Sequence, residues 1–356
     1  MDIYVLDGIN GIKDIISTYQ SCIWNVQYFG QNDFQLVVNA STSNVDILKP
    51  GTYLVREEDI SSDGFSNVMV IQDYTLEFDT EKGWLLTLIG KGLKNDILRR
   101  RIIWNQTNLT GNAEAAIRQV ITENVISPNE SGRAINDFIL DEVKGFTETI
   151  DLQLMGETLS AWLEEICTTY GYGWDVSIKN NKYLFSLYKG IDRTYGQSDV
   201  VPVVFSPEYD NLLSSTYSYN MSNYQNAALI GGEGEGTSQR TATIGTATGL
   251  NRYEAYIDGS SVSSNGEIIT VETYLKMLRE YGQSKLDQTS YTESFSGEID
   301  SDGLYKINRD YFLGDIVQIQ NEKGIQATPR IIEIIYAIDE NGTSVVPTFS
   351  QWEVNN

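Results

Sequence analysis

The chain has 356 residues, of which 41% are hydrophobic and 21% charged, and it carries a net charge of −24 at pH 7. This hydrophobic share can fill several cores, and with only 6 prolines it argues against a disordered chain. The charge excludes phosphate-driven binding of nucleic acid, because no segment is basic. No apolar run reaches the roughly 18 residues that a membrane-spanning helix needs.

The N-terminus and the cysteines carry no sign of export or redox chemistry. Residues 1–4 lack the basic and apolar regions of a signal peptide, so folding in a cytoplasm is expected. The two cysteines, Cys22 and Cys167, stand far apart in the sequence. We interpret both as small buried hydrophobic residues, and not as a disulfide or a nucleophile.

Residues 1–105 are predicted to form a first β domain, because apolar and polar residues alternate between turn signals. Two hairpins are expected there: residues 24–29 with 34–38, and residues 68–78 with 84–89. The basic cluster at 99–101 is interpreted as the solvated or ion-paired end of a strand.

Residues 106–205 are predicted to form an inserted α/β domain. One helix is expected after Asn112, which is a favourable N-cap residue. A second is expected from 159 to 170, with Thr158 as its N-cap and Gly171 as its C-cap. A hairpin should follow, formed by residues 174–178 and 183–187 around Asn180-Asn181.

Residues 206–356 are predicted to form a second β domain that contains one helix near 271–288, capped by Thr270. A polar, glycine-rich stretch runs from 231 to 249. Its segment 231–236 is superficially like a phosphate-binding loop, but two glutamates there would repel phosphate. We interpret these glycines as residues of a bend or bulge.

The two β domains share a weak internal repeat of turn, strand, loop, strand, turn and strand. The paired turn glycines are Gly51 and Gly83 in the first copy, 32 residues apart, and Gly314 and Gly342 in the second, 28 residues apart. Chance similarity is an open alternative, since this layout is common. If the repeat is real, the fold is mainly β, with two related barrels or sandwiches flanking a small α/β domain. Three such chains in a closed ring would present six similar units.

Most catalytic chemistry is absent from the sequence. There is no histidine, which excludes Ser-His-Asp and Cys-His catalysis and histidine-ligated metal sites. Among 49 acidic residues, no spacing singles out the carboxylate pair of a glycosidase. We therefore expect no enzyme activity, no cofactor and no metal site.

Three stretches of the chain resemble the tail-hub, or baseplate-hub, proteins of tailed phages and prophages. The first comprises residues 88–94, 97–98 and 100–102; the second comprises 226–236, Arg240 and 252–258; the third comprises 311–317, 330–333 and 347–349. Structural candidates within these stretches are Gly90, Arg100, Arg101, Gly232, Gly234, Arg240, Glu254, Asp258, Gly314 and Asp315. Asp315 is interpreted as fixing a strand-entry turn, and Glu254 and Asp258 as solvated or interfacial residues.

The resemblance implies a structural virion protein at the tail tip. Its expected partners are two further copies of itself, the hexameric tail tube or a distal tail protein, and a distal fibre, spike or receptor-binding protein. It implies a trimer whose two tube-like β domains per chain form a pseudo-hexameric ring around a DNA channel, without membrane insertion. Acidic channel walls would repel DNA and let it slide, although the charge could equally serve solubility.

Two other functions are open at this point. The many tyrosines and tryptophans suit a carbohydrate- or cell-wall-binding β protein, which exposed aromatic platforms would favour. A carboxylate-based hydrolase is the other alternative.

Overall fold

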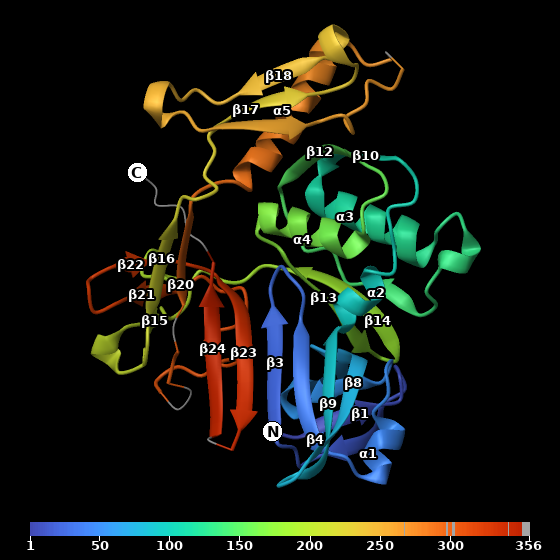
Figure 1. Cartoon of the computed structure of the whole chain (residues 1–356), viewed down its shortest axis with the longest axis vertical. Coiled ribbons are helices and arrows are strands. Elements are labelled where there is room, and N and C mark those ends of the chain that lie inside the picture. Colours follow the sequence, from blue (N-terminus) through green and yellow to red (C-terminus); the bar gives the residue numbers. More distant parts are fainter. Residues whose placement is uncertain (267, 297, 301–302, 341, 351–356) are drawn as a thin grey trace.

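The computed structural model describes residues 1–266, 268–296, 298–300, 303–340 and 342–350. Five sheets occur within these residues, and the largest draws strands from both ends of the chain (Figure 1). The order in this sheet is β16-β20-β24-β23-β3-β4-β9-β8-β5-β1-β2. Its N-terminal strands are β1 (Ile3–Leu6), β2 (Ile12–Ile16), β3 (Ser21–Gln27), β4 (Asp33–Asn39), β5 (Tyr53–Arg56), β8 (Met69–Asp79) and β9 (Gly83–Gly92). Its C-terminal strands are β16 (Thr216–Asn220), β20 (Thr292–Ser296), β23 (Ile331–Asp339) and β24 (Gly342–Phe349).

One face of this sheet packs on hydrophobic cores because apolar residues alternate along its strands. In β3 and β4 the buried residues include Trp24, Val26, Phe34 and Leu36, and they pack with residues of β1, β5 and β9. The short helix α1 (Thr42–Ile47) follows β4 and is capped by the Ser41 hydroxyl, which accepts from Asn44 N–H at 3.1 Å. A separate core lies on the C-terminal strands and includes Phe205, Tyr311 and Ile334.

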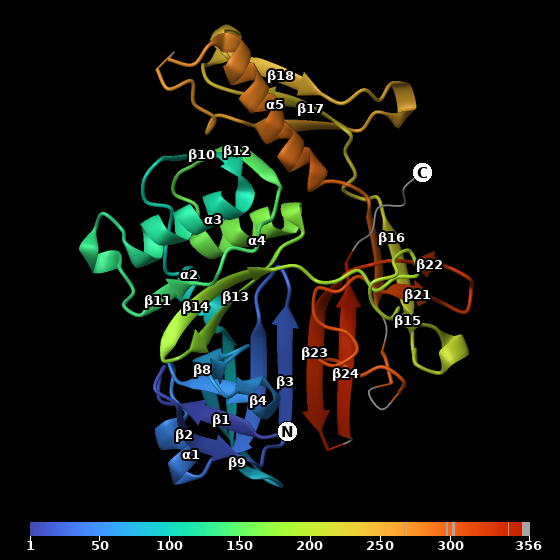
Figure 2. The ribbon, with the colours of Figure 1, turned by 180° about the vertical axis from the view of Figure 1, so that it is seen from behind.

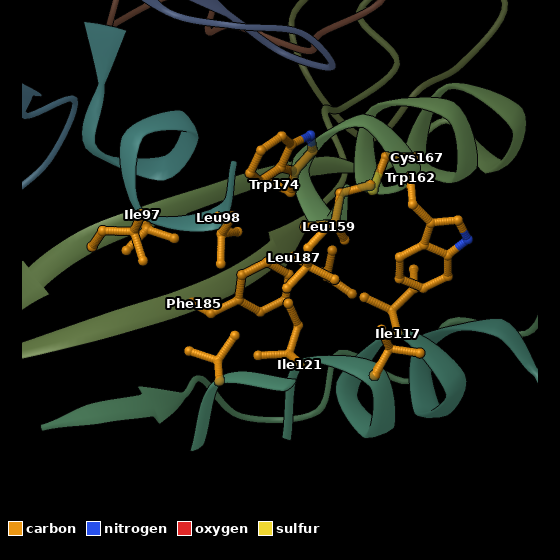
Figure 3. Close-up of a cluster of buried hydrophobic side chains, with 14 of the residues drawn as sticks. Ile97, Leu98, Ile117, Ile121, Leu159, Trp162, Cys167, Trp174, Phe185 and Leu187 are labelled. Carbon is orange, nitrogen blue, oxygen red and sulfur yellow. The ribbon is translucent and has the colours of Figure 1, made fainter. Parts of the chain in front are cut away.

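A small α/β domain sits at one end of the sheet (Figures 1 and 2). Its strands are β6 (Ile60–Ser61), β7 (Gly64–Phe65), β10 (Thr107–Asn112), β11 (Phe138–Leu140), β12 (Thr149–Leu154), β13 (Gly173–Lys179) and β14 (Lys182–Tyr188). Its helices are α2 (Leu93–Leu98), α3 (Ala113–Ile121) and α4 (Leu159–Tyr170). Figure 3 shows how Ile117, Leu159, Trp174 and Phe185 from these elements meet in one core. The β6–β7 hairpin comes from the first hundred residues but pairs with β13, so it ties the two parts together.

A third unit is inserted between β16 and β20 and lies beyond the α/β domain (Figure 2). It consists of β17 (Ala227–Gly231), β18 (Thr241–Ile244) and β19 (Glu254–Asp258), with helix α5 (Val271–Asp287) packed on them. Tyr274 and Leu278 of α5 are fully buried against Ile230. A last small sheet contains β15 (Val204–Phe205), β21 (Gln318–Gln320) and β22 (Gln326–Ala327).

Local predictions from the sequence are largely confirmed. The four hairpin strands of the first segment, the hairpin at 174–187 and the helices at 113–121, 159–170 and 271–287 all form. Gly171 ends α4 in the left-handed conformation, with φ +69°. Thr158 stands before α4, but its side chain caps no helix N–H, so that capping prediction is wrong.

The chain is mainly β, as expected. Seven strands of residues 1–105 and four of residues 206–356 that the structure describes nevertheless belong to one continuous sheet, because β23 pairs with β3. The basic cluster at 99–101 follows helix α2 and not a strand, which corrects the earlier interpretation. Within the described residues, no helix is both long and apolar enough to span a bilayer.

Candidate assembly surface

The two halves of the large sheet contain hairpins with the same register. In the first half β8 pairs with β9, and in the second β23 pairs with β24. Seven consecutive pairs correspond, from Asp73–Ile89 and Glu333–Thr348 down to Asp79–Gly83 and Asp339–Gly342. Each hairpin ends in a glycine with positive φ, +77° at Gly83 and +129° at Gly342.

The hairpins also share an irregularity and an entry turn. A β-bulge lies between Ile71 and Asp73 in β8, and between Ile331 and Glu333 in β23. The N–H of Gly51 donates to Ile71 O at 2.7 Å, and the N–H of Gly314 donates to Ile331 O at 2.8 Å. These glycines have φ values of +91° and +95°. Bulges and left-handed glycines are specific local features, so their coincidence indicates that the two halves repeat one structural plan.

The strand order repeats as well. Reading along the sheet, β16-β20-β24-β23 is followed directly by β3-β4-β9-β8. The pair Ser296–Thr348 joins β20 to β24 at the position where Gln35–Ile89 joins β4 to β9. Strand β16 therefore corresponds to β3, with Tyr217 in the place of Trp24.

The other face of these eight strands is mostly uncovered; at the start of β8, Val70 on this face is buried in the core of the α/β domain. Because successive side chains of a strand point to opposite faces, every second residue of each strand lies on this other face. Its charged members are Asp33, Asp73, Glu77, Asp79, Glu333, Asp339 and Lys91. Lys91 lies 3.6 Å from Asp33, and the remaining carboxylates give this face a negative charge.

Two buried cations, Arg56 and Lys94, connect the large sheet to neighbouring elements of the structure. Arg56 Nε donates to Asp59 Oδ2 at 2.6 Å, and its guanidinium lies 3.8 Å from the centre of the Tyr336 ring, so it joins β5 to β23. Lys94 of α2 donates to Gln27 O at 2.7 Å and to Trp174 O at 3.2 Å. Burial lowers the pKa of Lys94 to about 8.

Three of the candidate residues predicted from the sequence lie in the large sheet or at its edge. Gly90 sits opposite the bulge of β8, where a Cβ would overlap Val70 O and the Phe34 ring. At Gly314 a Cβ would overlap the Tyr28 ring. Asp315 is buried; it accepts from Phe312 N–H at 2.9 Å within its own turn and from Arg193 Nε at 2.5 Å. The Asp315 carboxylate therefore connects its own turn to the segment before β15 that contains Arg193.

Arg100 and Arg101 follow helix α2 and make local contacts. Arg100 is ion-paired with the buried Asp96, and Arg99 lies 3.2 Å from the same carboxylate. Arg101 Nε donates to Arg133 O at 3.2 Å. Both residues therefore anchor the entry to the α/β domain.

The other five candidates lie in the inserted unit of β17–β19 and α5. Gly232 and Gly234 lie where a Cβ would overlap Tyr274 or Ser238, and Gly234 has φ +97°. The unit also contains Arg240, which lies 5.3 Å from the Tyr274 ring centre and 3.7 Å from Glu233. Glu254 accepts from Arg252 Nε at 2.6 Å. Asp258 accepts from the N–H of Ser260, which lowers the pKa of Asp258.

The ten candidates are thus spread over three regions and form no single site. Sequence reasoning missed the buried cations Arg56 and Lys94 and the seven consecutive exposed residues of β8, Asp73–Asp79. The alternating pattern of 73–79 indicated a strand but not its exposure. No group of three or more Cys, Asp and Glu residues positioned to hold a metal ion occurs within the described residues.

This fold is that of phage tail proteins. The tail protein of Neisseria meningitidis MC58 has 12% identity and TM-score 0.59, with 98% of this chain and 95% of that chain covered. The 43 kDa tail protein of prophage MuSo2 from Shewanella oneidensis has 13% identity, TM-score 0.59 and 98% of both chains covered. Prophage tail protein gp18 of Listeria monocytogenes EGD-e has 12% identity and TM-score 0.51, with 100% and 95% covered.

The chain belongs to the family of Siphovirus ReqiPepy6 Gp37-like proteins, whose model matches residues 2–349. The resemblance to tail proteins of tailed phages is thereby confirmed. No curated protein is significantly similar to it in sequence. The family and the three structures are not described as enzymes.

Proposed function

We propose that this protein is a structural hub of the phage tail. Each chain contributes two half-sheets, β16-β20-β24-β23 and β3-β4-β9-β8. Three copies form a ring in which the six half-sheets are arranged with approximate six-fold symmetry. The ring joins the hexameric tail tube to a distal fibre, spike or receptor-binding protein, so the protein resides at the virion tail tip. The observation that carries this proposal is the shared register, bulge and strand order of the two halves.

The uncovered face of the half-sheets would line the channel. Its carboxylates outnumber its one lysine, and a negative wall repels DNA phosphates and reduces adhesion during passage. An assembled ring whose channel wall is basic would contradict this part of the proposal.

The first experiment is the mass of the purified protein in solution, measured by light scattering and native mass spectrometry. We expect a trimer of three times the 40.0 kDa chain mass. Electron microscopy of the particle then tests whether the trimer sits between the tube and a distal component. A protein that stays monomeric at high concentration, and is absent from the tail tip in the particle, would overturn the proposal.

A carbohydrate-binding tail-tip protein is the alternative. Exposed tyrosines such as Tyr209, Tyr253 and Tyr256 favour it, because sugar rings stack on aromatic faces. Trp24, Trp162 and Trp174 are buried, however, so half of the six tryptophans cannot form such a platform. Specific binding on a glycan array by a monomeric protein would favour this alternative.

A further inference from the structure

Three strand edges of the large sheet lack partners within the described residues: those of the terminal strands β2 and β16, and that of the distal part of β8. The repeat relates the edges of β8 and β16 to a contact inside the chain, whereas β2 has no counterpart in it. Strand β8 pairs with β9 along its whole length, but on its other side β5 reaches only Met69 and Val70. Every residue from Asp73 to Asp79 is exposed. Strand β16 ends the sheet, and all five of its residues are exposed. Open edges of this kind are templates for pairing with another strand.

We propose that the open edge of β8 in one protomer pairs antiparallel with β16 of the next copy, in the register that β23 and β3 already adopt within the chain. The inference rests on the proposed ring and specifies which edges close it. It follows from the repeat: β8 corresponds to β23 and β16 corresponds to β3. The β23–β3 contact is therefore an internal example of the contact between protomers.

The register follows from the internal contact. Within the chain, Ile335 pairs with Asn25 and Tyr336 with Trp24. Replacing each residue by its counterpart in the other half gives the pairs between protomers. These are Asp73 with Asn220, Tyr74 with Tyr219, Thr75 with Ser218, Leu76 with Tyr217, and Glu77 with Thr216.

Backbone directions agree with this register. Ala40 N–H donates to Trp84 O at 2.9 Å, so residue 84 faces β4 and residues 85 and 87 face β8. Their partners 75 and 77 then face β9, and residues 74 and 76 point their N–H and C=O groups outward. Tyr217 and Tyr219 of β16 correspond to Trp24 and Val26 of β3. In β3, Tyr28 N–H donates to Ile332 O at 2.8 Å, so by alternation residues 24 and 26 face β23 and not β4, and residues 217 and 219 correspondingly face away from β20. The proposed register places these outward residues opposite each other.

Side-chain chemistry agrees independently. Tyr74 and Leu76 are 40% and 43% exposed, unusual for large apolar residues along one strand, and they meet Tyr219 and Tyr217. On the other face, Thr75 meets Ser218. A slip of one residue would place each apolar side chain opposite a polar one on the wrong face, so the pattern selects this register.

The contact is heterologous, because β8 and β16 are different strands. Head-to-tail contacts form a closed ring when the rotation between units closes and a filament when it does not. Within the chain the same contact relates one half-sheet to the next, so each protomer advances the ring by two units. A second copy of this chain is therefore the partner that the edge fits.

Engineered disulfides test the register. Thr75 and Ser218 form a pair not joined by backbone hydrogen bonds, which brings their Cα atoms within the reach of a disulfide. In one chain these residues lie at opposite ends of the eight strands, so a bond between them must join two protomers. The native Cys22 and Cys167 are buried and leave the background low.

The double variant T75C/S218C should form covalent dimers and trimers on mild oxidation. The matched control is T75C/T216C, whose diagonal spacing is too long for a disulfide. We expect cross-linking about tenfold greater in the first variant than in the control. Equal cross-linking in both variants, or none in either, would overturn the proposed register.

Light scattering on the same samples separates the two proposals. A trimer without the T75C/S218C bond would leave the ring intact but refute this edge contact. A monomer without the bond would refute both. Covalent chains longer than three, seen as filaments by electron microscopy, would support the edge contact and refute the closed ring.

Discussion

The buried ion pair at the junction of the two halves gives the sharpest stability prediction. Arg56 is 1% exposed and its Nε lies 2.6 Å from Asp59 Oδ2, while its guanidinium stacks on Tyr336 of the other half. Replacing Arg56 with Met leaves the Asp59 carboxylate buried without its cation. Loss of one partner of a buried pair costs about 3–5 kcal/mol. Loss of the stacking on Tyr336 adds roughly 1 kcal/mol or more.

We therefore expect R56M to lower the free energy of unfolding by about 5 kcal/mol, a large part of the roughly 5–15 kcal/mol typical of a folded protein. Urea unfolding followed by tryptophan fluorescence measures it, since Trp24 lies 6.0 Å from the guanidinium. D59N should also lower the free energy of unfolding. The double variant R56M/D59N should lose less stability than the two single variants lose together, because the two side chains interact with each other.

K49M is the matched control, because the Lys49–Asp46 pair is exposed and 3.9 Å long. Such surface pairs contribute about 0–1 kcal/mol. If R56M unfolds at the same urea concentration as K49M, or if the R56M and D59N effects simply add, the ion pair does not join the halves as described.

Three further predictions concern single positions. Burial lowers the pKa of Lys94 from its ordinary 10.5 to about 8. Between these two pH values the unfolded chain binds more protons than the folded chain, so the free energy of unfolding relative to that of K94M should rise by on the order of 3 kcal/mol as the pH increases. A difference between the two proteins that does not change with pH in urea unfolding would refute this. G314A should lose about 3 kcal/mol through overlap with Tyr28, whereas G324A, with open space, should lose about 1 kcal/mol; thermal unfolding compares them. L76P removes an outward N–H, so light scattering should show loss of the trimer at unchanged melting temperature, and an intact trimer would argue against β8 pairing.

Local structure could be predicted from the sequence because its causes are local. Alternation along 24–38 and 68–89 was sufficient for the first hairpins, since side chains of a strand point to opposite faces. Asn112 and Gly171 marked helix ends because their backbone and side-chain geometry favours those positions. The paired glycines also indicated the repeat, because a left-handed turn requires glycine in both copies.

Other features depended on contacts between distant residues. Nothing in the pattern of 331–339 indicates that β23 pairs with β3, because an apolar strand fits many partners and only the packed core selects one. Burial of Arg56 and Lys94 likewise required partners that the fold brings together, Tyr336 and Trp174.

The sequence by itself determined the hairpins and the main helices, since periodicity and turn residues act over a few positions. It indicated a repeat of the two β regions but did not distinguish that repeat from chance similarity. The tertiary structure decided that the halves share one sheet and, among the residues that the structure describes, that β2, β8 and β16 have open edges. The physical reason is that strand pairing satisfies backbone groups whose chemistry is the same at every residue. The choice of partner is therefore made by the whole fold.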